Sequence, residues 1–274
     1  MGGRERVVDH YEETAVSGAG TEQESVKRFS NRVEYYIKYR PKYPPELIDF
    51  LRDSLGLSSS SVIADVGSGT GVLSEMFLKN GNRVFCVEPN KEMREAGEKL
   101  LQEYPGFTTI DGSAEATTLA PQSIDYVTAG QAFHWFDVPK ARAEFSRILR
   151  PEGFAVLLWN SRKTDSTPFL KAYENFLHQH GIDYQEVNQR NVDGQVLSRF
   201  FGAGRYRAEV FANAQVFDYE SLTGRVLSSS YMPMEGHPKY EPMIVELEKI
   251  FHEHQSDGTV KFEYDTEMYY GRIQ

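Results

Sequence analysis

The chain has 274 residues, of which 40% are hydrophobic, and carries a net charge of −10 at pH 7. This length and composition predict one large α/β domain with a full core and exclude general disorder. The acidic balance argues against a protein that grips nucleic-acid phosphates, so we expect no DNA partner. Because Cys86 is the single cysteine, an intrachain disulfide and a cysteine-rich zinc site are impossible, and we expect no bound metal.

The N-terminal residues are charged and lack the apolar core of a signal peptide, and no run of about 18 apolar residues indicates a membrane span. We therefore expect a cytoplasmic protein without a membrane partner. Residues 1–28 predict a mobile tail. Phe29 begins an apolar pattern with helical spacing, and that helix must end before Pro41 because the residue before a proline avoids the α region. Glu46–Leu55 predicts the next helix, with Pro45 in its first turn.

The next segment alternates between strand and helix patterns. Such alternation predicts a Rossmann-like, mostly parallel sheet with helices on both faces. These sheets bind ligands at the carboxyl ends of their strands, so functional residues are expected after each strand. The predicted strands are 61–66, 83–87, 108–110, 124–129 and 154–159, and the predicted helices are 71–79, 91–104 and 138–149, with Asn90 and Asp137 as N-caps of the last two.

The pattern changes after Trp159. Polar, less regular sequence follows Gly181 and runs to Gly204, and no element is predicted there. The remaining predicted elements are helices at 168–180, 219–227 and 243–254 and strands at 207–217 and 260–273.

The strongest motif is Asp65-Val66-Gly67-Ser68-Gly69-Thr70-Gly71, which runs from a buried strand into a helix. Alternate glycines let the backbone turn tightly and approach a ligand, and the helix N-terminus offers unpaired N–H groups. The dinucleotide fingerprint GxGxxG fails, because Val72 or Ser74 stands where its third glycine belongs. Asp65 would repel a pyrophosphate but suits a sulfonium or ammonium group, and Glu88, about 20 residues on, suits ribose hydroxyls. A nucleoside cofactor without phosphates therefore fits better than NAD.

The segment from Asp65 to Gly71, followed by Glu88, resembles the first two motifs of the class I S-adenosylmethionine-dependent methyltransferases. The resemblance covers about Tyr35 to Trp159. It departs mildly at Ser68, where the usual loop has cysteine, and at Glu152, which replaces a glycine. It implies a seven-stranded, mostly parallel sheet with a C-terminal antiparallel hairpin and a helical insert. Further matching segments are 39–44, 112–115 (the third motif), 123–127 (the fourth strand) and 149–154 (the turn into the fifth).

The resemblance also implies S-adenosylmethionine as the cofactor, with S-adenosylhomocysteine as its product. The alternative for Glu88 taken alone is a surface acid, but the context favours ribose binding. The alternatives are a core residue for Met93 and a salt bridge within a lid for Arg40. The implied cofactor-binding residues are Asp65, Gly67, Ser68, Gly69 and Gly71 in the loop, Glu88 at the ribose, Met93, Ser113 and Ala114 at the adenine, and Gln131 and Arg40 at the methionine end.

His134 follows the fourth predicted strand, a position that faces the transferred methyl group in the superfamily. An imidazole titrates near neutral pH, so His134 is a candidate general base. The alternative is a histidine that packs beside Trp135.

We expect residues 29–274 to form a single methyltransferase domain. The segment 29–43 and the 219–254 insert are predicted to form a lid that excludes water and shapes the acceptor pocket. The expected parts are lid helices at 29–57, a cofactor-binding core at 58–165, a substrate-side insert at 166–206 and 218–258, and C-terminal strands at 207–217 and 259–274.

The resemblance thus predicts a methyltransferase that acts by in-line displacement, with a small molecule as the expected acceptor. The acceptor atom stays open among O, N, S and C, and so does the oligomeric state. Two alternatives remain: a protein that binds the cofactor or its product without catalysis, and a methyltransferase acting on RNA or protein. An NAD-dependent oxidoreductase is disfavoured by Asp65 and by the missing third glycine.

Overall fold

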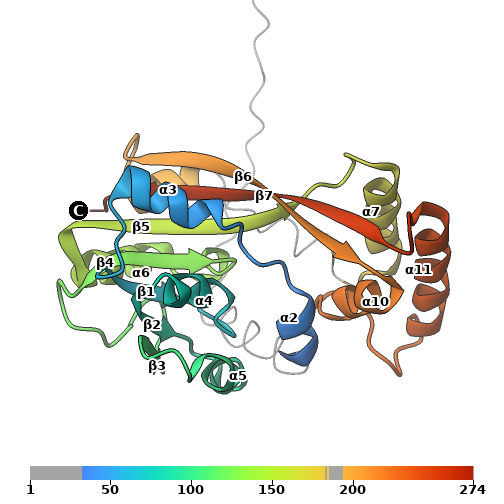
Figure 1. Ribbon diagram of the computed structural model, residues 1–274, viewed down its shortest axis with the longest axis horizontal. Coiled ribbons are helices and arrows are strands. Elements are labelled where there is room, and N and C mark those ends of the chain that lie inside the picture. Colours follow the sequence, from blue (N-terminus) through green and yellow to red (C-terminus); the bar gives the residue numbers. More distant parts are fainter. Residues whose placement is uncertain (1–32, 183, 185–193, 274) are drawn as a thin grey trace, which may run out of the picture.

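A computed structural model gives the fold of residues 33–182, 184 and 194–273. The predicted tail and Phe29 lie outside these described residues. Within them, seven strands form one sheet in the order β3-β2-β1-β4-β5-β7-β6 (Figure 1). Strands β1 to β5 pair in parallel, whereas β7 runs antiparallel to both β5 and β6, which confirms the predicted sheet and its C-terminal hairpin. The strands are β1 (Val62–Val66), β2 (Arg83–Val87), β3 (Phe107–Ile110), β4 (Ile124–Gly130), β5 (Leu149–Arg162), β6 (Tyr206–Phe217) and β7 (Val260–Gly271).

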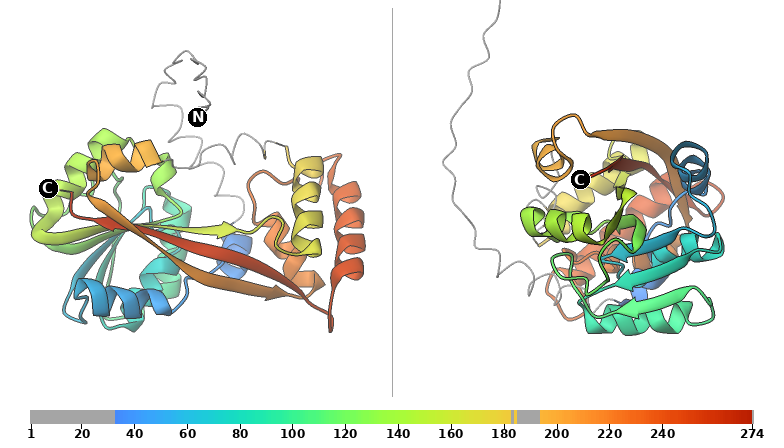
Figure 2. Two further views of the ribbon diagram at one scale, coloured as in Figure 1. Left: turned by 90° about the horizontal axis from the view of Figure 1, so that it is seen from above. Right: turned by 90° about the vertical axis from the view of Figure 1, so that its left-hand side faces the viewer.

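Helices cover both faces of the sheet, and a hydrophobic core fills each side (Figure 2). Leu51 and Phe77 are buried on one face, and Phe145 and Phe200 on the other. Because the central strands are covered on both faces, their sequences read as nearly continuous apolar runs. The first face carries α3 (Glu46–Leu55), α4 (Val72–Lys79) and α5 (Lys91–Leu101), and the second carries α6 (Val138–Ile148) and α9 (Gly194–Phe201).

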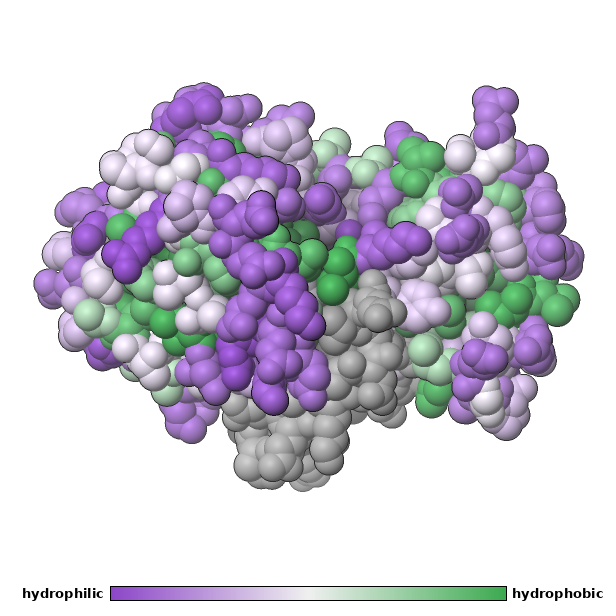
Figure 3. All heavy atoms as spheres, turned by 60° about the horizontal axis from the view of Figure 1, so that its bottom comes forward, coloured by the Kyte–Doolittle hydropathy of each residue, from purple (hydrophilic) through white to green (hydrophobic). Residues whose placement is uncertain are grey.

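Strands β5, β6 and β7 extend beyond this core into a second, smaller lobe (Figure 1). There α7 (Pro168–His180), α10 (Tyr219–Leu227) and α11 (Tyr240–His254) pack around an apolar core that includes Phe262. Figure 3 shows the two lobes side by side, with apolar side chains gathered where they meet. Helix α2 (Val33–Tyr39) contacts α10 of the small lobe and α5 of the large one.

The structure contains a helix that the sequence pattern did not predict. Helix α9 lies in the polar segment before Gly204. Leu197, Phe200 and Phe201 form its buried side and pack with α6 and the sheet. A helix this short is marginal alone, so tertiary burial of its apolar side stabilises it.

The other predicted elements are present, with ends that shift by a few residues. Strand β5 is longer than predicted, because its pairing with β7 continues to Arg162. The two predicted caps are confirmed: Asn90 accepts a hydrogen bond from the Met93 N–H, and Asp137 accepts one from the Lys140 N–H. Among the helices between Val33 and Gly271, none combines the length and apolar character that a membrane span requires.

Replacing Phe200 with alanine should lower the free energy of unfolding by about 3–5 kcal/mol. The side chain is fully buried, and its ring contacts those of Phe133 and Phe145. Urea denaturation followed by circular dichroism measures the change. The control is Val210→Ala on β6, where the side chain is 61% exposed and the change should stay within about 1 kcal/mol. A Phe200→Ala variant as stable as the parent would contradict the packing of α9.

Candidate active site

The glycine motif forms a tight loop between β1 and α4, at the carboxyl edge of the sheet. Gly67, Gly69 and Gly71 have φ angles of 69°, 56° and 85°, which glycine adopts readily. A Cβ at Gly67 would lie 2.6 Å from the Cβ of Ala132, so the loop lies directly against the segment after β4. A Cβ at Gly69 would meet no atom within 4 Å. The loop therefore presents open backbone at the edge where such sheets bind ligands.

Glu88 follows β2 and lies beside this loop. Its Oε2 accepts a hydrogen bond from the Gly69 N–H (2.8 Å), and its Oε1 accepts one from the Asn90 N–H (2.9 Å). Burial raises the pKa of this carboxyl, and the two N–H donors and Arg94 partly oppose that rise. Each carboxylate oxygen accepts up to two hydrogen bonds, so Glu88 retains acceptor capacity for the hydroxyls of a ligand.

Asp65 lies beneath the loop and is only 1% exposed. One of its carboxylate oxygens accepts a hydrogen bond from Ser74 Oγ (2.6 Å) and the other from Thr128 Oγ1 (3.0 Å). Burial raises the pKa of Asp65 to about 6, although these hydrogen bonds lower it in part. These bonds join β1, α4 and β4. Asp65 therefore points toward the base of the loop, whereas Gly69 and Glu88 lie at its open side.

Ser113 and Ala114 follow β3 in a turn where Ser113 pairs with Ala116. Ala114 is buried in the core on the α6 face. Met93 is buried at the start of α5. The same turn is fastened to α6, because Glu115 accepts a hydrogen bond from the Asp137 N–H (2.9 Å).

Gln131 follows β4 with a φ of 56°, which is uncommon for a residue other than glycine. Its backbone N–H donates to the Leu158 carbonyl (2.9 Å), and its Nε2 donates to the Asn160 carbonyl (3.2 Å). Strained backbone of this kind clusters at functional sites. Gln131 precedes Ala132, which touches the glycine loop, so the structure brings Gln131 to the same edge.

Asn160 on β5 is a polar centre that no sequence motif marks. Its Oδ1 accepts hydrogen bonds from Thr266 Oγ1 (2.5 Å) and Asn213 Nδ2 (3.1 Å). Its Nδ2 lies 3.5 Å from the carbonyl oxygens of both Pro41 and Lys42. This one side chain therefore ties the segment after α2 to the C-terminal hairpin. Its side-chain partners lie more than 50 residues away in sequence, so local sequence reasoning does not predict these hydrogen bonds.

Arg40 lies against the small lobe. Its Nη2 donates to the Ser228 carbonyl oxygen (2.9 Å) just after α10. Beside it, the Tyr39 ring packs so closely on Gly224 that a Cβ there would lie 2.0 Å from the ring. Tyr43 instead lies at the end of β4, where its hydroxyl would be 2.4 Å from a Cβ at Gly130. The segment therefore crosses from one lobe to the other.

His134 lies in a short 3-10 helix, Phe133–Trp135, just after Gln131. Its ring centroid is 4.9 Å from that of Trp135. The imidazole is thus on the segment that touches the glycine loop, and it also packs on the tryptophan as the alternative expected.

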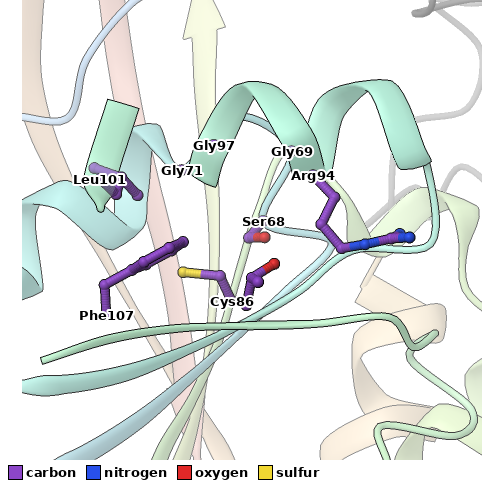
Figure 4. Close-up of a pocket in the computed structure, with 9 residues that line it drawn as sticks. Ser68, Gly69, Gly71, Cys86, Arg94, Gly97, Leu101 and Phe107 are labelled. Carbon is purple, nitrogen blue, oxygen red and sulfur yellow. The ribbon is translucent and has the colours of Figure 1, made fainter. Parts of the chain in front are cut away.

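A narrow pocket lies between the glycine loop and α5 (Figure 4). Helix α5 packs directly against the loop: a Cβ at Gly97 would lie 3.5 Å from the Gly69 carbonyl oxygen, an ordinary contact distance. The pocket includes neither Glu88 nor Gln131, so it adjoins the candidate site without coinciding with it. Its lining residues are Ser68, Gly69, Gly71, Cys86, Arg94, Gly97, Leu101, Phe107 and Thr109.

Comparisons with known proteins identify a family match in this region and similar proteins along the chain. Residues 64–157 match the family described as methyltransferase domain. The chain is 26% identical to an uncharacterized methyltransferase of Schizosaccharomyces pombe, with 89% of this chain and 96% of that protein covered. It is 37% identical to an uncharacterized methyltransferase of Mycobacterium tuberculosis over 49% of this chain and 52% of that protein.

Solved structures resemble the whole fold. A candidate type II methyltransferase from Anaeromyxobacter dehalogenans has a TM-score of 0.63 at 18% identity, covering 86% of this chain and 98% of that one. A geranyl diphosphate methyltransferase in complex with GPP and sinefungin has a TM-score of 0.54 at 15% identity, covering 93% of this chain and 100% of that one. At these identities the likeness concerns the fold.

Asp65 should make stability depend on pH. Its pKa of about 6 in the folded protein lies above the ordinary value of 3.8, so its contribution is full below about pH 4 and is lost as pH rises through 6. Asp65→Asn removes that titration. The unfolding free energy of the parent minus that of the variant should fall by about 2 kcal/mol between pH 4 and pH 7. Urea denaturation at several pH values measures it, and a difference independent of pH would contradict the burial of a titrating Asp65.

Proposed function

Because the chain belongs to the class I S-adenosylmethionine-dependent methyltransferase superfamily, we propose that it transfers a methyl group from that cofactor to a small-molecule acceptor. The cofactor, when bound, supplies a methyl group on a positively charged sulfur. The observation that carries the proposal is the pairing of open backbone at Gly69 with the Glu88 carboxylate at the carboxyl edge of β1 and β2.

The residues at this edge fit a nucleoside cofactor. Glu88 has acceptor capacity left for two ribose hydroxyls, and Gly69 leaves room for a ligand above the loop. We assign Ser113 and Ala114, after β3, to the adenine side and Gln131, after β4, to the methionine side. Asp65 takes a supporting role, because it holds the base of the loop through Ser74 and Thr128.

A small acceptor is favoured by what covers this edge. Tyr39 packs on Gly224 of the small lobe, while Tyr43 reaches Gly130 at the end of β4. Such a cover excludes water and fixes two reactants in line, which supplies much of the rate of a methyl transfer. We propose that the segment after α2 and the small lobe together form the lid, and that Arg40 fastens the lid through its bond to the Ser228 carbonyl. The net charge of −10 gives no support to an RNA acceptor.

Titration calorimetry with S-adenosylmethionine and then S-adenosylhomocysteine is the first test, and we expect micromolar binding of both. Gly69→Arg should abolish it, because the added side chain fills the space above the loop. The matched control is Gly258→Arg, since Gly258 also has a positive φ (74°) and nothing within 4 Å of a Cβ. Failure of the parent to bind either ligand, with its fold intact, would refute the proposal. Binding without turnover of any acceptor would favour a non-catalytic binding protein.

We propose His134 as general base for acceptors that must lose a proton. Once an acceptor is identified by labelled-methyl screening, His134→Gln should lower kcat by about 10²- to 10⁴-fold and remove the acid limb of the pH–rate profile, because the unprotonated imidazole accepts the proton. Affinity for S-adenosylhomocysteine should be unchanged. The control is His252→Gln on the exposed side of α11. An unchanged pH–rate profile would assign His134 to packing on Trp135.

A further inference from the structure

Arg225 on α10 is buried, and no acidic side chain in the described part of the chain forms an ion pair with it. The residue is only 6% exposed. Its Nη1 donates hydrogen bonds to Ser229 Oγ (3.0 Å) and Ser228 Oγ (3.4 Å). Its Nε has no hydrogen-bond partner. None of the described Asp and Glu residues forms an ion pair with this guanidinium, whose neighbours are hydroxyl groups. An arginine remains charged in a protein, so the small lobe holds a positive charge that no described residue neutralises.

Tyrosines surround this guanidinium. Burial alone lowers the pKa of Arg225, but the hydroxyl oxygens of Tyr264, Tyr173 and Tyr231 outweigh that effect and raise it. Tyr173 and Tyr264 are almost fully buried. Arg225 therefore lies among hydroxyl-bearing side chains, with Ser228 and Ser229 at hydrogen-bond distance and the three tyrosines near enough to affect its pKa.

A second arginine in this cluster is paired, and the contrast defines the local charge. Arg162 forms a buried ion pair with Glu174 and lies over the Tyr173 ring, 5.0 Å from its centroid. Two guanidinium groups and one carboxylate leave one net positive charge beside Tyr173. A buried unpaired charge is costly, and packing alone gives no reason to keep one.

We infer that Arg225, with the hydroxyls of Tyr173, Tyr231 and Tyr264, forms a binding subsite for one carboxylate of the methyl acceptor. This inference rests on the proposed function and names the class of acceptor: a carboxylic acid with an aromatic or unsaturated body. One net positive charge matches a carboxylate, whereas a phosphate monoester carries nearly two negative charges at pH 7. The planar guanidinium matches a carboxylate with two parallel hydrogen bonds, and the tyrosine rings provide apolar walls.

The sheet register connects the subsite to the candidate site. In the β5–β7 ladder Asn160 pairs with Thr266, and Arg162 pairs with Tyr264. Side chains two residues apart on a strand lie on one face, about 7 Å apart. Since Gln131 is bonded to the Asn160 carbonyl, Tyr264 lies one such step beyond the methionine end assigned above. The carboxylate of the acceptor therefore binds away from the transferred methyl group, and another atom of the acceptor receives the methyl.

Helix α2 controls access to Arg225. It contacts α10 at Gly224 through the Tyr39 ring, and the adjacent Arg40 contacts the Ser228 carbonyl. The Tyr39 carbonyl also accepts a hydrogen bond from Gln215 (3.3 Å), whose Oε1 accepts one from the Tyr264 hydroxyl (2.9 Å). Movement of α2 away from α10 would uncover α10 at Gly224 and Ser228, on either side of Arg225.

The test measures carboxylate binding to the full chain saturated with S-adenosylhomocysteine. The probes are benzoate, cinnamate and 3-phenylpropanoate, each compared by calorimetry with its primary amide, and phenyl phosphate. At least one carboxylate should bind about tenfold or more tightly than its amide and than phenyl phosphate. Arg225→Met should remove the preference, and Arg142→Met, which removes an arginine bonded to the Phe200 carbonyl on the opposite face, should keep it.

A purely structural role for Arg225 gives different results. Without ligand, Arg225→Met should unfold at the same or a higher urea concentration than the parent, because it removes an uncompensated buried charge. Equal binding of acids and amides, or a preference that survives Arg225→Met, would overturn the inference, as would a less stable variant with unchanged binding. Should Arg225→Met fail to fold, Arg225→Lys provides the comparison: the charge stays, the two-bond geometry is lost, and carboxylate affinity should fall. Absence of S-adenosylhomocysteine binding in the parent would instead refute the proposed function.

Discussion

The backbone of the glycine loop is the constraint on which the site depends. Three positive φ angles within five residues turn the chain from β1 into α4, and they aim the Gly69 N–H at the Glu88 carboxylate. A side chain at Gly67 would displace Ala132, so the same loop also sets where the segment after β4 lies. The buried Asp65 carboxylate fixes the loop from below. Glu88 and Gln131 reach one edge because this loop holds its shape.

The long strands β5 and β7 run from that edge of the sheet into the small lobe. Strands β5 and β7 remain paired from the core out to Arg162, so residues on one face form a row that starts beside Gln131 and ends among the tyrosines of the small lobe. Asn160 in this row also holds the segment after α2. A shift of the β5–β7 pairing by one residue would move these side chains to the other face of the sheet. The register of the ladder therefore determines which side chains lie next to Gln131.

The small lobe treats its two buried arginines differently. Arg162 is neutralised by Glu174, whereas Arg225 has only hydroxyl partners. A buried pair is weak evidence of function, since its attraction roughly offsets its desolvation. A buried guanidinium without a described ion-pair partner indicates a function, because its burial costs folding free energy. Helix α2 contacts α10, which carries Arg225, and also α5 of the large lobe, so this one element touches both lobes.

The sequence by itself determined the alternating sheet, the glycine loop, the position of Glu88 after the second strand and the helix caps. Each of these depends on residues within one turn or one strand–loop–helix unit. It did not predict the hydrogen bonds of Asp65, whose partners Ser74 and Thr128 come from two other elements. It also missed α9, which is stable only when its apolar side is buried against α6. Neither the hydrogen bonds of Asn160 nor the burial of Arg225 follows from a local sequence pattern. Only the tertiary structure decided their roles, because burial and distant partners, not neighbours in sequence, determine what a polar side chain can bind.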